Sequence, residues 1–201
     1  MPLVSTDIMT VKRDFLRVKQ TEFTLSEGSL LIAAPLSPDM LFNRSVILLT
    51  DYNKETVAGV IVNKPTPFVL DRLVDSISIK APLYIGGPVS PEMLFLLHNH
   101  SNSDAASAIR PGIFFGYNDQ LLKQIEQRLF PSIRYKFILG YSGWAPGQLE
   151  AEIANNYWVI GNPTPELLFN TEPDQIWHKA VSILGKEYEH WLKIPESPHL
   201  N

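Results

Sequence analysis

The stretch Gly140-Tyr141-Ser142-Gly143-Trp144-Ala145-Pro146-Gly147-Gln148-Leu149-Glu150 carries the strongest indication of how this chain folds. The apolar segment from Tyr135 to Leu139 precedes it and predicts a strand, and the segment from Gln148 to Ala154 predicts a short helix. Closely spaced glycines and a proline between them indicate a tight connection, in which the backbone approaches either another strand or a ligand. The residues alone leave open which of the two it approaches.

Short apolar runs on both sides of this stretch predict further strands. They are Leu30 to Ala34, Val46 to Thr50, Val57 to Val62, Leu83 to Ile85, Met93 to Leu97, Ile113 to Gly116 and Tyr157 to Ile160. The turn composition of Asp51 to Glu55 predicts a hairpin between the second and third of them. The almost continuous apolar character of the first three runs predicts burial on both faces of the sheet there.

Helical spacing of apolar residues predicts three longer helices. The first begins at the capping residue Thr66 and runs to Ile77, and the second follows Asn118 and ends before Pro131. The third follows a capping box at Thr171 to Asp174 and ends near Gly185. Because strands and helices are interspersed without strict alternation, we predict a single compact α+β domain with a mixed, largely antiparallel sheet flanked by helices. We place it at residues 28–192, between an N-terminal arm or helix (1–27) and a C-terminal tail (193–201).

Composition restricts the function. The chain of 201 residues has no cysteine, which excludes disulfides, thiolate metal sites and a cysteine nucleophile. Its net charge of −4 argues against direct nucleic-acid binding, although Lys12 to Lys19 is locally basic. The N-terminus lacks the pattern of a secretory signal, and the apolar runs fall far short of the ~20 residues that span a bilayer. We therefore expect a cytoplasmic protein without a membrane partner.

Candidate catalytic residues are sparse. The strand–Ser142–helix arrangement resembles a nucleophile elbow, but Trp144 occupies the position of the second glycine. The alternative is an enzyme of unknown reaction, such as a hydrolase using the Gly140–Gln148 region, with Ser142, His98 and Glu152 as its acid–base or nucleophilic groups. His98 and His100 have the spacing of a metal site with Asp104 nearby, but a solvated loop is the favoured interpretation. We therefore expect no catalytic set, no metal and no cofactor.

A ligand site is the alternative that these turns support. If the turns lie at one end of the sheet, seven residues converge on a cleft: Asn63, Gly86, Gly87, His98, Tyr141, Trp144 and Gln148. Each also has a structural interpretation, because Asn63 can satisfy turn backbone and Gly86-Gly87 can form a tight turn rather than an anion cradle. Trp144 is expected to be mostly buried, and Gly143 or Gly147 to adopt a conformation that is costly for other residues.

Taken in order, the motifs resemble the YqgE/AlgH family of bacterial proteins (UPF0301, DUF179). The matching blocks are Gly28 to Pro35, Asp39 to Phe42, Ser45 to Leu49, Ala58 to Pro65, Tyr84 to Val89, Leu96 to His98, Gly140 to Trp144 and Gly147 to Ile153, with Trp158. The resemblance covers roughly residues 28 to 185. It implies a compact α+β domain of the bacterial cytoplasm and brings no agreed catalytic set. Ser142 is often alanine in that pattern, and His100 is not part of it.

The resemblance also bears on function. Members of that family are described as uncharacterised, or as transcriptional regulators by association with alginate control. Together with the missing catalytic set, this favours a non-enzymatic binding or regulatory protein. We expect it to act through a protein or small-molecule partner rather than by binding DNA directly, because no basic recognition helix is visible.

Overall fold

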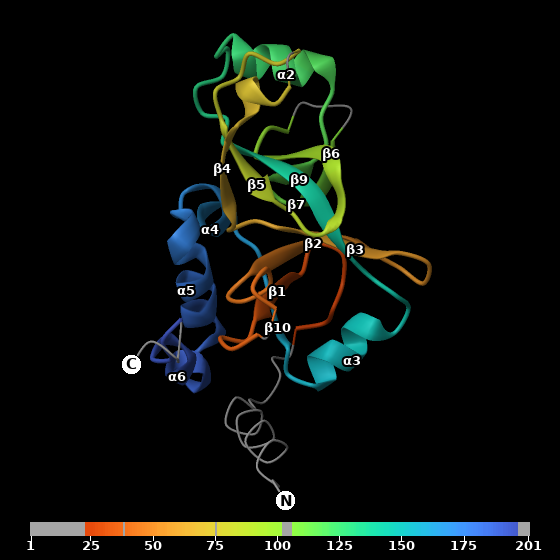
Figure 1. Ribbon diagram of the computed structural model, residues 1–201, viewed down its shortest axis with the longest axis vertical. Coiled ribbons are helices and arrows are strands. Elements are labelled where there is room, and N and C mark those ends of the chain that lie inside the picture. Colours follow the sequence, from red (N-terminus) through yellow and green to blue (C-terminus); the bar gives the residue numbers. More distant parts are fainter. Residues whose placement is uncertain (1–22, 38, 75, 102–105, 197–201) are drawn as a thin grey trace, which may run out of the picture.

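One long strand, β9 (Tyr135–Trp144), joins two halves of a ten-stranded sheet (Figure 1). The computed structural model describes residues 23–37, 39–74, 76–101 and 106–196. Most of the predicted N-terminal arm, with its basic cluster, and the end of the predicted tail lie outside these residues. Every strand pair is antiparallel within the described part of the chain, except β5 with β9. The predicted α+β class with a mixed, largely antiparallel sheet is confirmed.

The first half of the sheet has its strands in the order β10-β1-β2-β3-β9. Its strands are β1 (Leu30–Ala33), β2 (Val46–Tyr52), β3 (Val57–Ile61) and β10 (Trp158–Gly161). Alternate residues of β1 enter different cores, because successive side chains of a strand point to opposite faces. Leu30 and Ile32 pack with Trp177, while Leu31 and Ala33 pack with Leu149. The predicted burial on both faces is confirmed.

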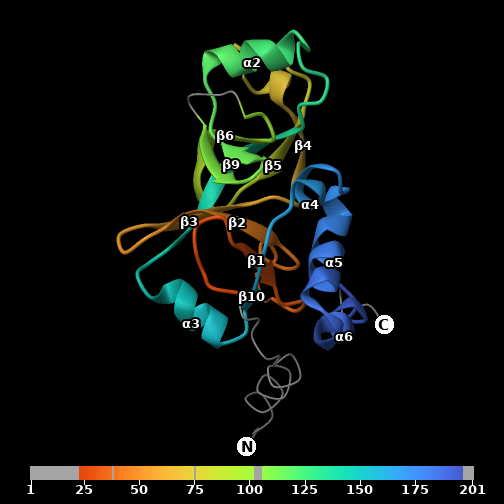
Figure 2. The ribbon, with the colours of Figure 1, turned by 180° about the vertical axis from the view of Figure 1, so that it is seen from behind.

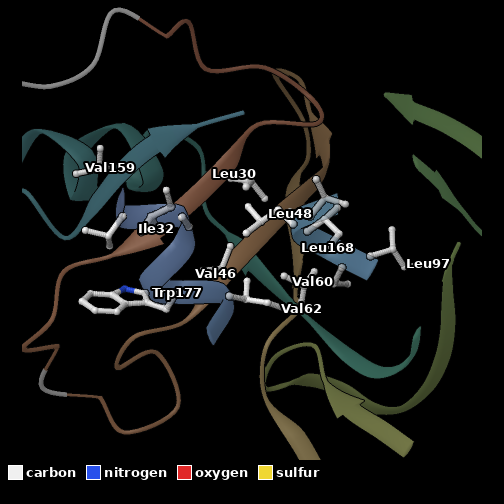
Figure 3. Close-up of a cluster of buried hydrophobic side chains, with 14 of the residues drawn as sticks. Leu30, Ile32, Val46, Leu48, Val60, Val62, Leu97, Val159, Leu168 and Trp177 are labelled. Atoms are coloured by element: carbon white, nitrogen blue, oxygen red, sulfur yellow. The ribbon is translucent and has the colours of Figure 1, made fainter. Parts of the chain in front are cut away.

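Helices cover both faces of this half of the sheet (Figures 1 and 2). On one side lies α3 (Gln148–Ala154). On the other lie α4 (Pro165–Phe169), α5 (Pro173–Leu184) and α6 (Glu189–Leu192), with the 3-10 turn η2 (Lys186–Tyr188) between the last two. Figure 3 shows Trp177 of α5 beside Val46 in the larger core. No helix in the described ranges is both long and apolar enough to cross a membrane.

The second half of the sheet is built around the first part of β9. Its strands are β4 (Pro65–Val69), β5 (Pro82–Ile85), β6 (Val89–His98), β7 (Ser107–Arg110) and β8 (Ile113–Phe115). The helix α2 (Asp119–Glu126) closes its core with Leu121 and Ile125. As predicted, α2 begins after Asn118, whose side chain accepts a hydrogen bond from the Leu121 amide at 2.8 Å.

Several predicted elements differ in the structure. The helix expected from Thr66 to Ile77 is instead β4 followed by a 3-10 turn, η1 (Leu70–Arg72). Its apolar residues still contribute to a core without forming a helix: Leu70 is buried and Val74 and Ile77 pack against the same cluster, while Leu73 is exposed. Pairing of Pro65 with Tyr84 of β5 instead selects the extended backbone that residues before proline favour. Strand β7 and helix α4 were not predicted.

Two helix ends also differ from the prediction. α2 ends at Glu126, several residues before Pro131. The capping box before α5 is absent: Glu172 is the N-cap residue without a side-chain cap, and the Thr171 hydroxyl donates to the Glu166 carbonyl instead. That carbonyl lies in α4, so a helix that was not predicted takes the hydroxyl away from the expected cap.

The glycine-rich stretch continues as strand through Trp144, so its backbone approaches another strand rather than forming a loop. The Gly86 amide donates to the Leu139 carbonyl at 2.7 Å, and the Gly86 carbonyl accepts from the Ile61 amide at 2.9 Å. A Cβ atom on Gly86 would lie 2.2 Å from the carbonyl oxygen of Gly140, which itself has φ +68°. Glycine at both positions therefore allows the two halves of the sheet to meet.

We expect Gly86→Ala to lower the free energy of unfolding by about 3 kcal/mol or more, because its new methyl group meets backbone that cannot move away. Gly143→Ala in β9 is the matched control: the atom nearest to its Cβ would be Tyr141 Cε2 at 3.5 Å, an ordinary contact. Its effect should stay within about 1 kcal/mol. Urea unfolding measures both, and equal stability of the two variants would contradict the close approach.

Candidate functional site

A pocket of about 220 Å³ lies where the start of β2, the end of β3 and helix α5 meet. Its lining includes Arg44, Asn63, Lys64, Trp177, His178 and Glu196. Arg44 lies just before β2, and Asn63 and Lys64 lie just after β3. Because β2 and β3 are antiparallel neighbours, with Ile47 opposite Ile61, these two strand ends lie side by side. The hairpin therefore brings two cations to one place.

Asn63 holds the two strand ends together. Its Oδ1 accepts from the Val46 amide at 2.8 Å, and its Nδ2 donates to the Arg44 carbonyl at 2.9 Å. The structural interpretation of this residue thus applies, although its side chain also lines the pocket. Lys64 donates from Nζ to the Asn43 carbonyl at 2.7 Å. Asn63 and Lys64, which both follow β3, are therefore fixed against the turn that carries Arg44.

Arg44 is the most constrained residue of the pocket. Its backbone is left-handed, with φ 51°, which is uncommon for a residue other than glycine. The side chain is only 8% exposed, and its guanidinium carbon lies 4.7 Å from the centre of the Trp177 ring. Burial lowers the pKa of Arg44, and the nearby Glu196 carboxylate offsets part of that shift. The guanidinium is thus held in place at a cost in solvation.

The hydrogen bonds of this guanidinium are incomplete. One terminal nitrogen donates to the Ile194 carbonyl, and the other lies 3.4 Å from Glu196 Oε1. Among the described residues, the buried Nε of Arg44 has no hydrogen-bond partner, and the same holds for Nδ1 of His178. An arginine fork typically binds a carboxylate or phosphate through two parallel bonds. The site therefore has unused capacity for an oxyanion.

The predicted ligand residues Gly86, Gly87 and Tyr141 lie at the junction of the two sheet halves. A Cβ on Gly87 would lie 2.2 Å from the backbone of Tyr141. The hydroxyl of the buried Ser142 donates to the Gly86 carbonyl at 3.1 Å. The backbone amide and carbonyl of Gly86 therefore bond to neighbouring strands, and the Ser142 hydroxyl bonds to the same carbonyl.

Trp144 and Gln148 belong to a different cluster, centred on Glu152. Glu152 Oε2 accepts from the indole nitrogens of Trp144 at 2.9 Å and Trp158 at 2.7 Å, and Oε1 accepts from Gln148 at 2.9 Å. Trp144 is mostly but not fully buried, as predicted, and Gly147 has a left-handed backbone with φ 78°, which is costly for other residues. The cluster fastens α3 to β9 and β10, which gives these residues a structural role.

His98 is fully buried at the end of β6. Its Nε2 donates to the Gly116 carbonyl at 3.1 Å, and its Nδ1 accepts from the His100 amide at the same distance, so both nitrogens of a neutral ring are used. The third candidate metal ligand, Asp104, lies outside the described residues. Within the described ranges, no group of three or more histidine, aspartate or glutamate side chains could hold a metal ion.

Several residues of the pocket were not singled out in the sequence as site residues, among them Arg44, Trp177, His178 and Glu196. The available signal was weak. An arginine and a serine directly before the buried strand β2 read as ordinary turn residues, and Trp177 reads as the apolar stripe of a helix. Their proximity arises from the packing of α5 on the sheet, which periodicity does not reveal.

We expect the buried imidazole to make stability depend on pH. Burial, with a smaller contribution from the charge of His100, lowers the pKa of His98 to about 4 from its ordinary 6.5. Between these values the unfolded chain binds the proton more readily, so stability is present above pH 6.5 and is lost as the pH falls. The loss from about pH 7 to about pH 4.5 should reach about 2–3 kcal/mol.

His98→Gln provides the comparison, since its amide can donate to the same Gly116 carbonyl but does not titrate. Other carboxylates titrate in both proteins, so the informative quantity is the difference between their pH slopes, measured by urea unfolding. Parallel slopes would show that His98 is protonated in the folded state at the lower pH, contrary to its burial.

Comparison with known proteins finds relatives that match most of the chain. Residues 30–189 match the model of the AlgH-like family, DUF179. A UPF0301 protein of Bacteroides fragilis is 34% identical over 196 residues, covering 96% of this chain and 100% of that protein. A UPF0301 protein of Chlorobaculum tepidum is 34% identical over 180 residues, covering 88% and 96%.

Two solved structures share the fold. The solution structure of the AlgH protein from Pseudomonas aeruginosa has a TM-score of 0.67 at 26% identity, covering 89% of this chain and 98% of that one. The crystal structure of a protein from Corynebacterium diphtheriae has a TM-score of 0.72 at 20% identity, covering 89% and 96%. The family match, the full-length relatives and the shared fold agree, and the chain therefore belongs to the AlgH-like family.

Proposed function

We propose that this chain is a non-enzymatic binding protein with a regulatory role, and that its ligand presents a compact anion to the pocket at Arg44 and Lys64. The observation that carries the proposal is the state of Arg44. A left-handed backbone, a buried guanidinium and an Nε without a partner in the described part of the chain each cost free energy, and such features concentrate at functional sites. An oxyanion bound there would complete the hydrogen bonds and offset the buried charge.

Pocket size and charge support a small anionic group. A volume of about 220 Å³ is below the range of drug-sized ligand sites, so it suits a compact molecule or one end of a larger one. Burial lowers the pKa of Lys64, and the charge of Glu196 offsets part of that shift while Arg44 adds to it. The Glu196 carboxylate therefore raises the pKa of both Arg44 and Lys64 against the effect of burial.

A binding role fits the residues better than catalysis does. The groups that an enzyme would use, Ser142, His98 and Glu152, each make hydrogen bonds that hold strands or helices in place. The regulatory part of the proposal rests on the family resemblance alone, because members of that family are described as transcriptional regulators by association. With a net charge of −4, the chain is better suited to regulate through a protein or small-molecule partner than through DNA.

A titration of the ¹⁵N-labelled full chain tests this proposal, with succinate and inorganic phosphate as separate probes. The indole N–H of Trp177 and the Nε–H of Arg44 should shift saturably, with a dissociation constant near about 1 mM. Arg44→Lys keeps the charge but loses the planar fork, so binding should weaken about tenfold or more.

Arg72→Lys serves as the control, because Arg72 is exposed and lies in η1. It should bind both probes as the wild type does. The proposal is wrong if neither probe produces a saturable shift in the wild-type chain, or if Arg44→Lys binds the probes with unchanged affinity.

A further inference from the structure

The C-terminal segment of this chain already lies in the pocket. The Ile194 carbonyl accepts a hydrogen bond from one terminal nitrogen of Arg44, and the Glu196 carboxylate approaches the other at 3.4 Å. Ile194 itself packs against the larger hydrophobic core. A main-chain carbonyl and a carboxylate two residues later thus share one guanidinium, with an apolar side chain beside them.

This contact is weak enough to be exchanged. The Glu196 side chain is 72% exposed, and its distance to Arg44 is long for a charge-assisted hydrogen bond. Ion pairs of this kind contribute little because water screens them. Nε of Arg44 remains without a partner among the described residues even with the segment in place. The segment therefore occupies the site without using its full binding capacity.

The charges of the pocket select the class of ligand. Arg44 and Lys64 bring two positive charges, and the exposed Asp174 that also lines the pocket brings one negative charge. Without Glu196, these three groups leave one positive charge, which a single carboxylate balances. A polyphosphate would add like charges close to Asp174, which disfavours it.

We propose that the pocket recognises a short acidic peptide segment, in which an apolar residue is followed two positions later by a glutamate, and that Ile194-Pro195-Glu196 occupies it in cis. A partner protein presenting such a segment would displace the chain's own. This inference rests on the proposed function, since it specifies the ligand of the same pocket. It makes the C-terminal segment a tethered competitor that sets the threshold for partner binding.

A peptide with the sequence of residues 193–201, carrying a fluorophore at its N-terminus, tests the inference by fluorescence anisotropy. It is titrated with the full chain as wild type and as Glu196→Gln, which removes the competing carboxylate. We expect Glu196→Gln to bind the peptide about twofold to fivefold more tightly than the wild type, because only the weak cis contact is lost. Glu189→Gln, which removes an exposed carboxylate from α6, should bind like the wild type.

A second peptide, carrying Glu196→Gln, should bind each of these chains about twofold to fivefold more weakly than the first, because it lacks the same carboxylate. The inference is overturned if both peptides bind equally, or if the wild-type and Glu196→Gln chains bind the first peptide equally. A parallel succinate titration separates the two proposals. Succinate binding without peptide binding overturns only the peptide inference, whereas failure of both probes in every chain overturns the proposed anion site as well.

Discussion

The close contact between Gly86-Gly87 and Gly140 is the constraint on which the rest of the structure depends. The first part of β9 lies between β5 and β6, and its last residues pair with β3, so one strand belongs to both halves of the sheet. Backbone atoms occupy the space that side chains would need. Lys136 adds a polar connection, donating to the Val62 carbonyl at 2.9 Å while its ammonium faces the Tyr84 ring. Burial lowers the pKa of this lysine to about 8, so it stays protonated at neutral pH.

The candidate site depends on this arrangement because its parts come from elements that β9 and its neighbours hold in register. Lys64 lies just after β3, and the amide of Ile61, the last residue of that strand, donates to the Gly86 carbonyl. The indole of Trp177 donates to the Ala33 carbonyl at 2.8 Å, which fixes α5 over β1 and places the ring against Arg44. The pocket is therefore preorganised by the fold, because the surrounding packing determines the positions of its polar side chains.

The sequence predicted the features that neighbouring residues encode, and it missed those that depend on contacts between distant segments. Local signals succeeded: the hairpin of β2 and β3, the Asn118 cap and the short helix α3 are encoded by neighbouring residues. The helix prediction for Thr66 to Ile77 was wrong, because the apolar spacing of that segment fits a helix whereas its pairing with the distant strand β5 makes part of it a strand. Closely spaced glycines predicted close approach but not the partner, which lies in a distant segment. The pocket went unseen because Arg44, Trp177 and Glu196 meet only through tertiary packing.

Native-state hydrogen exchange tests most directly whether β9 makes the two halves one cooperative unit. The relevant amides are Leu31 and Ile47 in one half, and Leu96 and Phe137 in the other, all of which are buried. We predict that the most protected amides of both halves exchange with one common free energy, equal to that of global unfolding, and fall together as denaturant is added. A plateau for β1 and β2 that differs from that of β6 and β9 would mean that the halves open independently, and would contradict this account.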